Sequence, residues 1–140
     1  MEQETLIRLD ETDFEVASPS DDVRGMMVKD RDGEEIGEVD NLLIDEQEKK
    51  VRFLEVGSGG FLGIGGERRL IPVDAVTDID DEAVHVDKTR DSVAGSPAYD
   101  PEVVRTDSAY YGGLYGYYGY PPFWSAGYIY PGAYGYPRRP

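Results

Sequence analysis

Residues 26–39 read Met26-Met27-Val28-Lys29-Asp30-Arg31-Asp32-Gly33-Glu34-Glu35-Ile36-Gly37-Glu38-Val39, which is the pattern of a β-hairpin. Two apolar runs are separated by residues 29–34, a polar segment rich in turn-forming residues. Gly33 in this segment can adopt the positive φ angle that a tight turn requires. We therefore expect the chain to reverse direction here, between two antiparallel strands.

Short apolar runs separated by polar turns continue on both sides of this hairpin. Residues 5–9 form a candidate edge strand, residues 41–44 extend the second strand of the hairpin, and residues 51–56, 69–76 and 83–86 follow as further strands. Strands of this length and spacing, without a βαβ pattern, predict an all-β fold built as a small antiparallel barrel or sandwich.

Two details of this pattern bear on the core and on helices. The period-two alternation of residues 51–56 places Val51 and Phe53 on the face of the strand that is directed toward a core. Only residues 91–94 and 101–105 have a pattern that could form helical turns.

The composition of the chain changes abruptly near Asp107. All 29 acidic residues lie at or before Asp107, and ten of the 11 tyrosines lie after it. Residues 1–109 contain 12 basic and 29 acidic side chains, a net charge of −17, whereas residues 110–140 carry only the two positive charges of Arg138 and Arg139. The chain therefore consists of an acidic, strand-rich domain and a tail of tyrosine, glycine and proline that is uncharged until it closes with Arg138 and Arg139.

The charge and the residue types restrict the partners and the compartment. A domain with this negative charge is a poor ligand for duplex nucleic acid and for an anionic membrane, because lysine and arginine carry most of the affinity for phosphate. The chain has no cysteine, which fits a reducing compartment. The acidic first residues do not resemble an export signal, and the uncharged stretch 108–137 contains too much glycine and proline for a membrane-spanning helix. We expect a cytoplasmic protein without a transmembrane segment.

Several motifs, in this order, resemble those of the PRC-barrel family. They are Asp22-Val23-Arg24-Gly25, Asp32-Gly33-Glu34-Glu35-Ile36-Gly37-Glu38-Val39, Gly60-Phe61-Leu62-Gly63-Ile64-Gly65-Gly66, Leu70-Ile71-Pro72-Val73-Asp74-Ala75, Val84-His85-Val86 and Ser96-Pro97-Ala98-Tyr99-Asp100. The family is named for the cytoplasmic domain of the H subunit of the photosynthetic reaction centre, and it includes the C-terminal domain of a ribosome maturation factor. The resemblance implies a small PRC-type antiparallel β-barrel that acts by protein contact rather than by catalysis.

The resemblance also suggests a division of the chain. Residues 1–21 form a lead with the candidate edge strand, 22–101 the barrel-like domain, 102–109 a linker and 110–140 a disordered, low-complexity tail. We expect the chain to depart from the reaction-centre subunit in having no transmembrane anchor, and from the ribosome factor in having no preceding RNA-associated domain. Neither specific role is transferred to it.

The glycine-rich stretch 57–68 is the first candidate for a functional site. It lacks the lysine and the serine or threonine of a phosphate-binding loop, and it leads into a strand rather than a helix. We expect a connection whose Phe61, Leu62 and Ile64 cover one end of the barrel or contact a partner. Arg68 and Arg69 could bind an acidic partner, and surface ion pairs are the alternative.

Carboxylates and the single histidine give no catalytic, cofactor or metal prediction. The acids of 30–35 do not have the spacing of an EF-hand loop, and those of 78–82 are explained by a solvated turn. His85 is the only histidine, and it is expected to lie exposed or at the rim of the barrel. We therefore expect a protein that is not an enzyme and has no cofactor.

The tail contains the block Tyr-Gly-Tyr-Pro twice, at 118–121 and at 134–137. Its scarcity of aliphatic residues predicts disorder in isolation. Its aromatic rings are suited to weak, multivalent contacts, and the alternative interpretation is a dispensable extension or one that folds back over the barrel. The candidate contact residues in the tail are Tyr117, Tyr118, Tyr120, Phe123 and Trp124.

The sequence thus favours a non-catalytic protein-interaction or scaffold module whose protein partner is unidentified, with a homo-oligomer as an open outcome. The alternatives are a structural or surface-associated assembly protein driven by the tail, an accessory factor of a photosynthetic reaction-centre-type electron-transfer complex, and a domain that binds a ligand or metal through its acidic turns.

Overall fold

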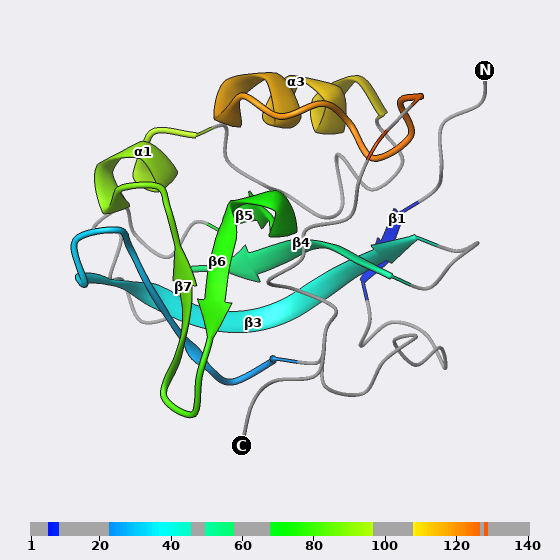
Figure 1. Ribbon diagram of the computed structural model, residues 1–140. Coiled ribbons are helices and arrows are strands. Elements are labelled where there is room, and N and C mark those ends of the chain that lie inside the picture. The colour runs from blue at the N-terminus through cyan, green and yellow to red at the C-terminus, as the bar shows by residue number, and fades with distance from the viewer. Residues whose placement is uncertain are drawn as a thin grey trace.

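The computed structural model of the chain describes residues 6–8, 23–45, 50–57, 68–96, 108–126 and 128. Seven strands form one curled sheet (Figure 1). They are β1 (Leu6–Arg8), β2 (Met27–Lys29), β3 (Glu35–Asp45), β4 (Val51–Val56), β5 (Arg69–Pro72), β6 (Val76–Ile79) and β7 (Ala83–Val86). The helical elements are η4 (Val73–Ala75), α1 (Arg90–Ala94) and α3 (Ser108–Tyr118).

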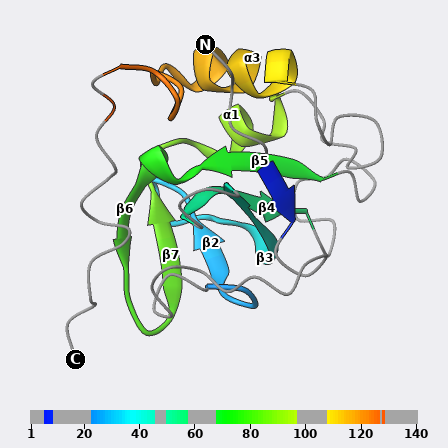
Figure 2. The same ribbon diagram turned by 90° about the vertical axis from the view of Figure 1, so that its right-hand side faces the viewer.

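The sheet curls because β3 is shared between two halves. The strand order is β5-β4-β3-β2-β7-β6, and β1 pairs with the last residues of β3. The register between β3 and β4 shifts twice, and irregularities of this kind bend a strand and increase its twist. The 3-10 turn η4 joins β5 to β6, the two outer strands, so the chain connects the open ends of a half-barrel (Figure 2). The small all-β barrel expected from the sequence is confirmed as a curled half-barrel.

One strand pair runs against the expected antiparallel arrangement. β2 and β7 are parallel, with Met27 opposite Ala83 and Val28 opposite Val84. β7 is the second strand of the β6–β7 hairpin. It lies beside β2 and runs in the same direction as β2. The other strand pairs of the described residues are antiparallel.

The predicted hairpin of residues 26–39 is present as β2 and β3. Gly33 has φ +84°. The Oδ1 atom of Asp30 accepts hydrogen bonds from the backbone N–H groups of Asp32 (2.9 Å) and Glu34 (2.8 Å), and its Oδ2 atom accepts one from the N–H of Arg90 (2.8 Å). Burial raises the pKa of Asp30, but these N–H groups outweigh it and hold the pKa below its ordinary value. Asp30 thus ties the hairpin turn to the start of α1.

The expected edge strand and one of the two candidate helical turns are also confirmed. β1 occupies Leu6–Arg8, and α1 occupies Arg90–Ala94 with Thr89 as its N-cap. The second candidate turn, 101–105, and residues 58–67 of the glycine-rich connection lie outside the described residues.

The expectation of a disordered tail is corrected over residues 110–126. The structure has the helix α3 and a following turn there, and Tyr111, Leu114, Tyr115 and Tyr118 belong to the same hydrophobic core as the barrel. The physical reason is that large rings on this segment find apolar barrel surface to bury, which a segment in isolation lacks. The alternative that the tail folds back over the barrel describes this part of the chain. Gly127 and residues 129–140 lie outside the described residues.

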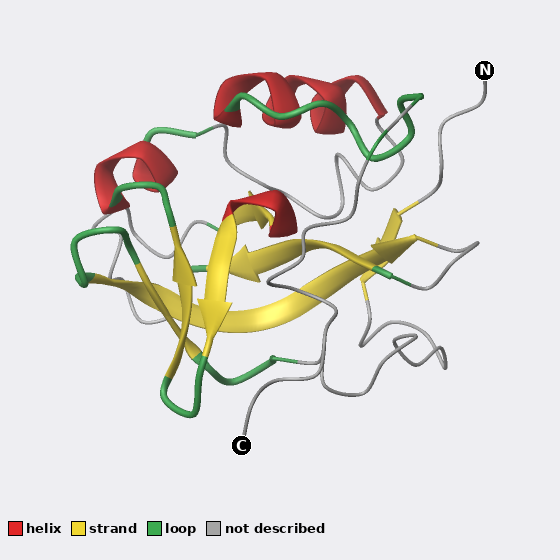
Figure 3. Ribbon diagram, viewed as in Figure 1, coloured by secondary structure: helices red, strands yellow, loops and turns green. Residues whose placement is uncertain are grey.

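Within the described residues, the three helical elements lie on one side of the curled sheet (Figure 3). Hydrophobic residues from β3, β4 and β5 form the centre of the core, and Phe53 is fully buried. The placement of α3 over β4 and β5 brings its tyrosines to this part of the sheet (Figure 1).

The role of Asp30 can be tested within its own turn. Replacing Asp30 with alanine leaves three backbone donors without an acceptor, so we expect Asp30→Ala to lower the free energy of unfolding by about 1–3 kcal/mol. Asp32→Ala, at an exposed site in the same turn, should change it by less than about 0.5 kcal/mol. Urea denaturation of both variants measures the difference, and equal effects would contradict the assigned role.

Candidate functional site

The most distinctive site of the molecule is the aromatic segment, defined as residues 110–126 with Tyr128, where it lies on the barrel. Within α3 the buried residues are Tyr111, Leu114, Tyr115 and Tyr118. This spacing of three, four and seven residues places them on one face of a helix. The Phe53 ring of β4 lies 5.6 Å from the ring of Tyr111 and 5.0 Å from that of Tyr115, measured between centroids. Packing against β4 therefore orients the helix.

A glycine ends the helix and directs the rest of the segment back toward the barrel. Gly119 has φ +89°, and its N–H donates to the carbonyl of Tyr115 at 2.8 Å. The N–H of Tyr120 donates to the same carbonyl at 2.9 Å. A residue with positive φ after the last helical turn is a common C-terminal cap, and glycine adopts it without steric cost.

Four tyrosine hydroxyls of the segment donate hydrogen bonds to acceptors outside it. Tyr117 donates to the carbonyl of Ser92 (2.7 Å), Tyr118 to that of Leu70 (3.0 Å), Tyr120 to Asp87 Oδ1 (3.2 Å) and Tyr128 to Asp74 Oδ2 (2.9 Å). The acceptors come from α1, β5, the residue after β7 and η4. In each of these hydrogen bonds the donor lies on the segment and the acceptor lies on the rest of the domain.

A buried ion pair supports the far end of the segment. Arg52 Nε lies 2.9 Å from Asp45 Oδ1, and both side chains are at most 5% exposed. The guanidinium carbon of Arg52 is 4.4 Å from the centroid of the Phe123 ring and 5.9 Å from that of Tyr128. Cation–π contacts of this kind are strongest where water is excluded. Arg52 therefore joins β3, β4 and the aromatic segment in one cluster.

Burial sets the protonation of the segment. It raises the pKa of Tyr118 to about 12, against a weaker opposing hydrogen bond from Ser96. Burial also raises the pKa of the Tyr115 and Tyr128 hydroxyls, and the negative charge of Asp74 adds to it. The pKa of Asp74 itself is raised by burial, although the hydrogen bond from Tyr128 opposes this shift. The hydroxyls of Tyr115, Tyr118 and Tyr128 therefore remain protonated at neutral pH.

Two buried polar atoms beside this cluster lack a hydrogen-bond partner among the described residues: Asp74 Oδ1 and Tyr115 Oη. The backbone N–H of Phe123 is near enough to lower the pKa of Tyr115 slightly, but it does not reach hydrogen-bond geometry. A buried polar group without a partner costs stability, so Tyr115 contributes through its ring and not through its hydroxyl.

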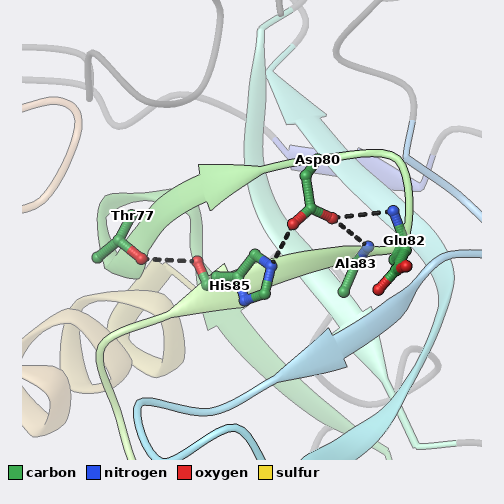
Figure 4. A network of polar contacts seen from close by, with 5 residues as sticks. All are labelled: Thr77, Asp80, Glu82, Ala83 and His85. Carbon is green, nitrogen blue, oxygen red and sulfur yellow. Dashed lines mark hydrogen bonds and ion pairs between the residues drawn. The ribbon is translucent and has the colours of Figure 1, made fainter.

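The hairpin of β6 and β7 carries a second polar cluster (Figure 4). Asp80 Oδ1 accepts from the N–H groups of Glu82 and Ala83, each at 2.9 Å, and Asp80 Oδ2 lies 2.8 Å from His85 Nε2. The two N–H groups and His85 lower the pKa of Asp80 to about 2. Asp78, opposite His85 in the sheet, completes a group whose ligand atoms lie within 4.8 Å of one another. Such a group could contact a divalent cation, but the contacts of Asp80 and His85 stabilise the turn.

The candidate contact residues are not all equally accessible. Phe61, Leu62 and Ile64 lie outside the described residues. Arg68 is half-exposed, and its Nε is 3.2 Å from Oε2 of the fully buried Glu55. Arg69 is buried and donates to the carbonyl of Ala94.

Within the tail, the accessible candidate residues are fewer than the sequence suggests. Tyr118 and Phe123 are buried against the domain, and Tyr120 and Trp124 are half-buried. Tyr117 is 45% exposed, the most open large hydrophobic residue of the described chain.

Sequence reasoning overlooked several residues that build this site. Asp45, Arg52, Glu55 and Asp74 are buried or half-buried polar residues in or beside strands, and the alternating pattern did not distinguish them from surface residues. A signal for α3 existed in the helical spacing of its four buried residues, but the glycines and the additional tyrosines between them concealed it.

The fold and the site together define a class: a small β-domain with an aromatic segment packed on it. The PRC-barrel domain matches residues 15–93, more than half of the chain. The chain therefore belongs to the PRC-barrel family. The aromatic segment lies beyond the matched range. A search of the curated proteins finds no match. In the part of the chain that the structure describes, no helix has the length and apolar character needed to cross a membrane.

A pair of tyrosine variants tests the assigned hydrogen bonds. Tyr118→Phe removes the bond to the Leu70 carbonyl and should lower the free energy of unfolding by about 0.5–1.5 kcal/mol. Tyr115→Phe removes a buried hydroxyl that has no hydrogen-bond partner among the described residues, so stability should stay the same or rise. Chemical denaturation monitored by circular dichroism provides the comparison. A larger loss for Tyr115→Phe would show that its hydroxyl has a partner after all.

We expect the free energy of unfolding to decrease over a defined range of alkaline pH. In the unfolded chain tyrosine ionises near 10.0, whereas burial moves the pKa of Tyr118 to about 12. Between these values the unfolded chain has lost protons that the folded protein keeps, so stability is complete below pH 10 and falls as pH rises toward 12. Tyr118→Phe should make this decline shallower. Thermal melts across the window measure the slope, and an unchanged slope would remove Tyr118 as a contributor.

Proposed function

We propose that this protein is a non-catalytic protein-interaction module, in which the acidic PRC-barrel domain displays the aromatic segment as part of its contact surface. The observation that supports this proposal most directly is the placement of an uncharged aromatic layer on a chain of net charge −15. The family supports the same interpretation, because the PRC-barrel is generally a non-catalytic fold.

The polar groups with structural roles favour a binding protein over an enzyme. Asp30 holds a turn, Asp45 pairs with Arg52, and Asp80 caps a hairpin. Asp74 accepts the hydroxyl of Tyr128. Each of these carboxylates already has a partner that explains its position.

The exposed part of the layer has the chemistry of a protein-binding surface. Tyr117 is 45% exposed, and Trp124 is half-buried on the same segment. The Trp124 ring packs edge-on against those of Tyr115 (5.9 Å) and Phe123 (5.1 Å), so its orientation is fixed before a partner arrives. Tyrosine and tryptophan are enriched among the residues that dominate binding energy, because rigid rings bury large area at low entropic cost.

Site-specific cross-linking tests this surface. A photo-reactive residue at position 117 should capture a discrete protein from native lysate, whereas the same residue at Thr77, an exposed position on β6, should not. The captured protein is then purified and titrated against the full chain. Tyr117→Ala with Trp124→Ala should weaken binding at least about tenfold and Thr77→Ala should leave it unchanged. Equal capture at both positions, or equal affinity of all variants, would contradict the proposal.

A further inference from the structure

The first Tyr-Gly-Tyr-Pro block shows how this sequence is held on the domain. Tyr118 donates to the carbonyl of Leu70 on β5, and Tyr120 donates to the carboxylate of Asp87. The positive φ of Gly119 between them allows the helix to end so that both rings reach their acceptors. Lys88 Nζ lies 4.8 Å from the centroid of the Tyr120 ring. The domain thus recognises both tyrosines of the block, and the glycine conformation is part of the recognition.

The chain contains the same four residues a second time, at 134–137, followed directly by Arg138 and Arg139. The block at 118–121 has no flanking cation and continues into Pro122. The domain that would receive the second block is acidic, with a net charge of −17 over residues 1–109, and one acceptor at the site is the carboxylate of Asp87. The second block therefore has the residues that the site recognises and, in addition, a charge opposite to that of the domain.

The first block is attached through a helix that is weak by itself. A side-chain carbon at Gly113 or Gly116 would meet no atom within 4 Å, and one at Gly112 would make only an ordinary contact with Trp124. Packing therefore does not require these glycines, although each lowers helix stability by about 0.5–1 kcal/mol relative to alanine. Contacts with the domain hold α3 in place, and the segment can leave the barrel more readily than an alanine-containing helix would.

We propose that the site holding Tyr118–Pro121 also accepts the second block, Tyr134–Pro137, from another copy of the chain. While the aromatic segment remains on its own domain, its site is filled and the second block of that chain has no place there. A neighbouring copy whose segment has detached offers the vacant site. Each chain would then carry one site and two blocks, so that copies become linked. This inference rests on the proposed interaction function and names a second copy of the chain as one partner.

Analytical ultracentrifugation of the full chain tests the linkage. The mean mass should rise reversibly with protein concentration. Tyr134→Ala with Tyr136→Ala should abolish the rise, whereas Tyr130→Ala, a tail tyrosine outside the block, should preserve it. A concentration-independent mass for the unmodified chain would overturn the proposal, as would a double variant that still associates.

The site of contact can be located by paramagnetic broadening. Because the chain has no cysteine, Ala133→Cys gives a single attachment point for a nitroxide beside the second block. Mixed with isotope-labelled unmodified chain, it should broaden the amide signals of Leu70 and Asp87 in the other molecule. Unbroadened signals of Leu70 and Asp87 in this mixture would overturn the proposal. Capture of another protein through position 117 would be unaffected, so the two proposals fail separately.

Alanine substitutions in α3 test the same proposal by stabilising the helix instead of removing the second block. Gly113→Ala with Gly116→Ala should stabilise α3 and reduce the detached population by about tenfold, and association should weaken accordingly. Association through the surface of the closed molecule would instead be insensitive to these substitutions, and unchanged association in this variant would contradict the exchange mechanism.

Discussion

The burial of β4 on both of its sides is the constraint on which the rest of the structure depends. All six residues of Val51–Val56 are buried, including Arg52 and Glu55. The aromatic segment covers part of this strand, because the Phe53 ring contacts those of Tyr111 and Tyr115 and the guanidinium of Arg52 lies over the ring of Phe123. Residues of the segment consequently belong to the same hydrophobic core as the barrel.

The buried ion pair of Arg52 and Asp45 is a second link between β4 and the aromatic segment. The Arg52–Asp45 pair is almost completely withdrawn from water, and the rings of Phe123 and Tyr128 lie near the guanidinium. A buried ion pair contributes little net stability, but leaving one partner unpaired is costly. The pair therefore favours a single arrangement of β3, β4 and the segment over others of similar hydrophobic content. Tyr128 and Asp74 extend the same arrangement to η4.

The sequence predicted the parts of the fold that depend on local pattern. The hairpin around Gly33 follows from turn chemistry, and the strand of 51–56 follows from its alternation, which are both properties of neighbouring residues. The parallel pairing of β2 with β7 could not be read in this way, because it depends on where a distant hairpin joins the sheet.

The aromatic segment was harder to predict for a different physical reason. Local composition argues for disorder, since Gly112, Gly113 and Gly116 oppose a helix, and only burial against Phe53 reverses that balance. The polar residues of the site were hidden as well. Arg52 and Asp74 become recognisable only when the elements that cover them are in place.

Trp124 makes this layer spectroscopically distinct from the barrel. It is the single tryptophan of the chain, and it lies within the aromatic segment against Tyr115 and Phe123. Its fluorescence therefore reports the environment of the segment, whereas far-ultraviolet circular dichroism is dominated by the backbone of the whole domain. A transition seen in the emission but not in the dichroism would mark release of the layer from an intact barrel. Trp124 is thus an intrinsic fluorescence probe for release of the aromatic segment from the barrel.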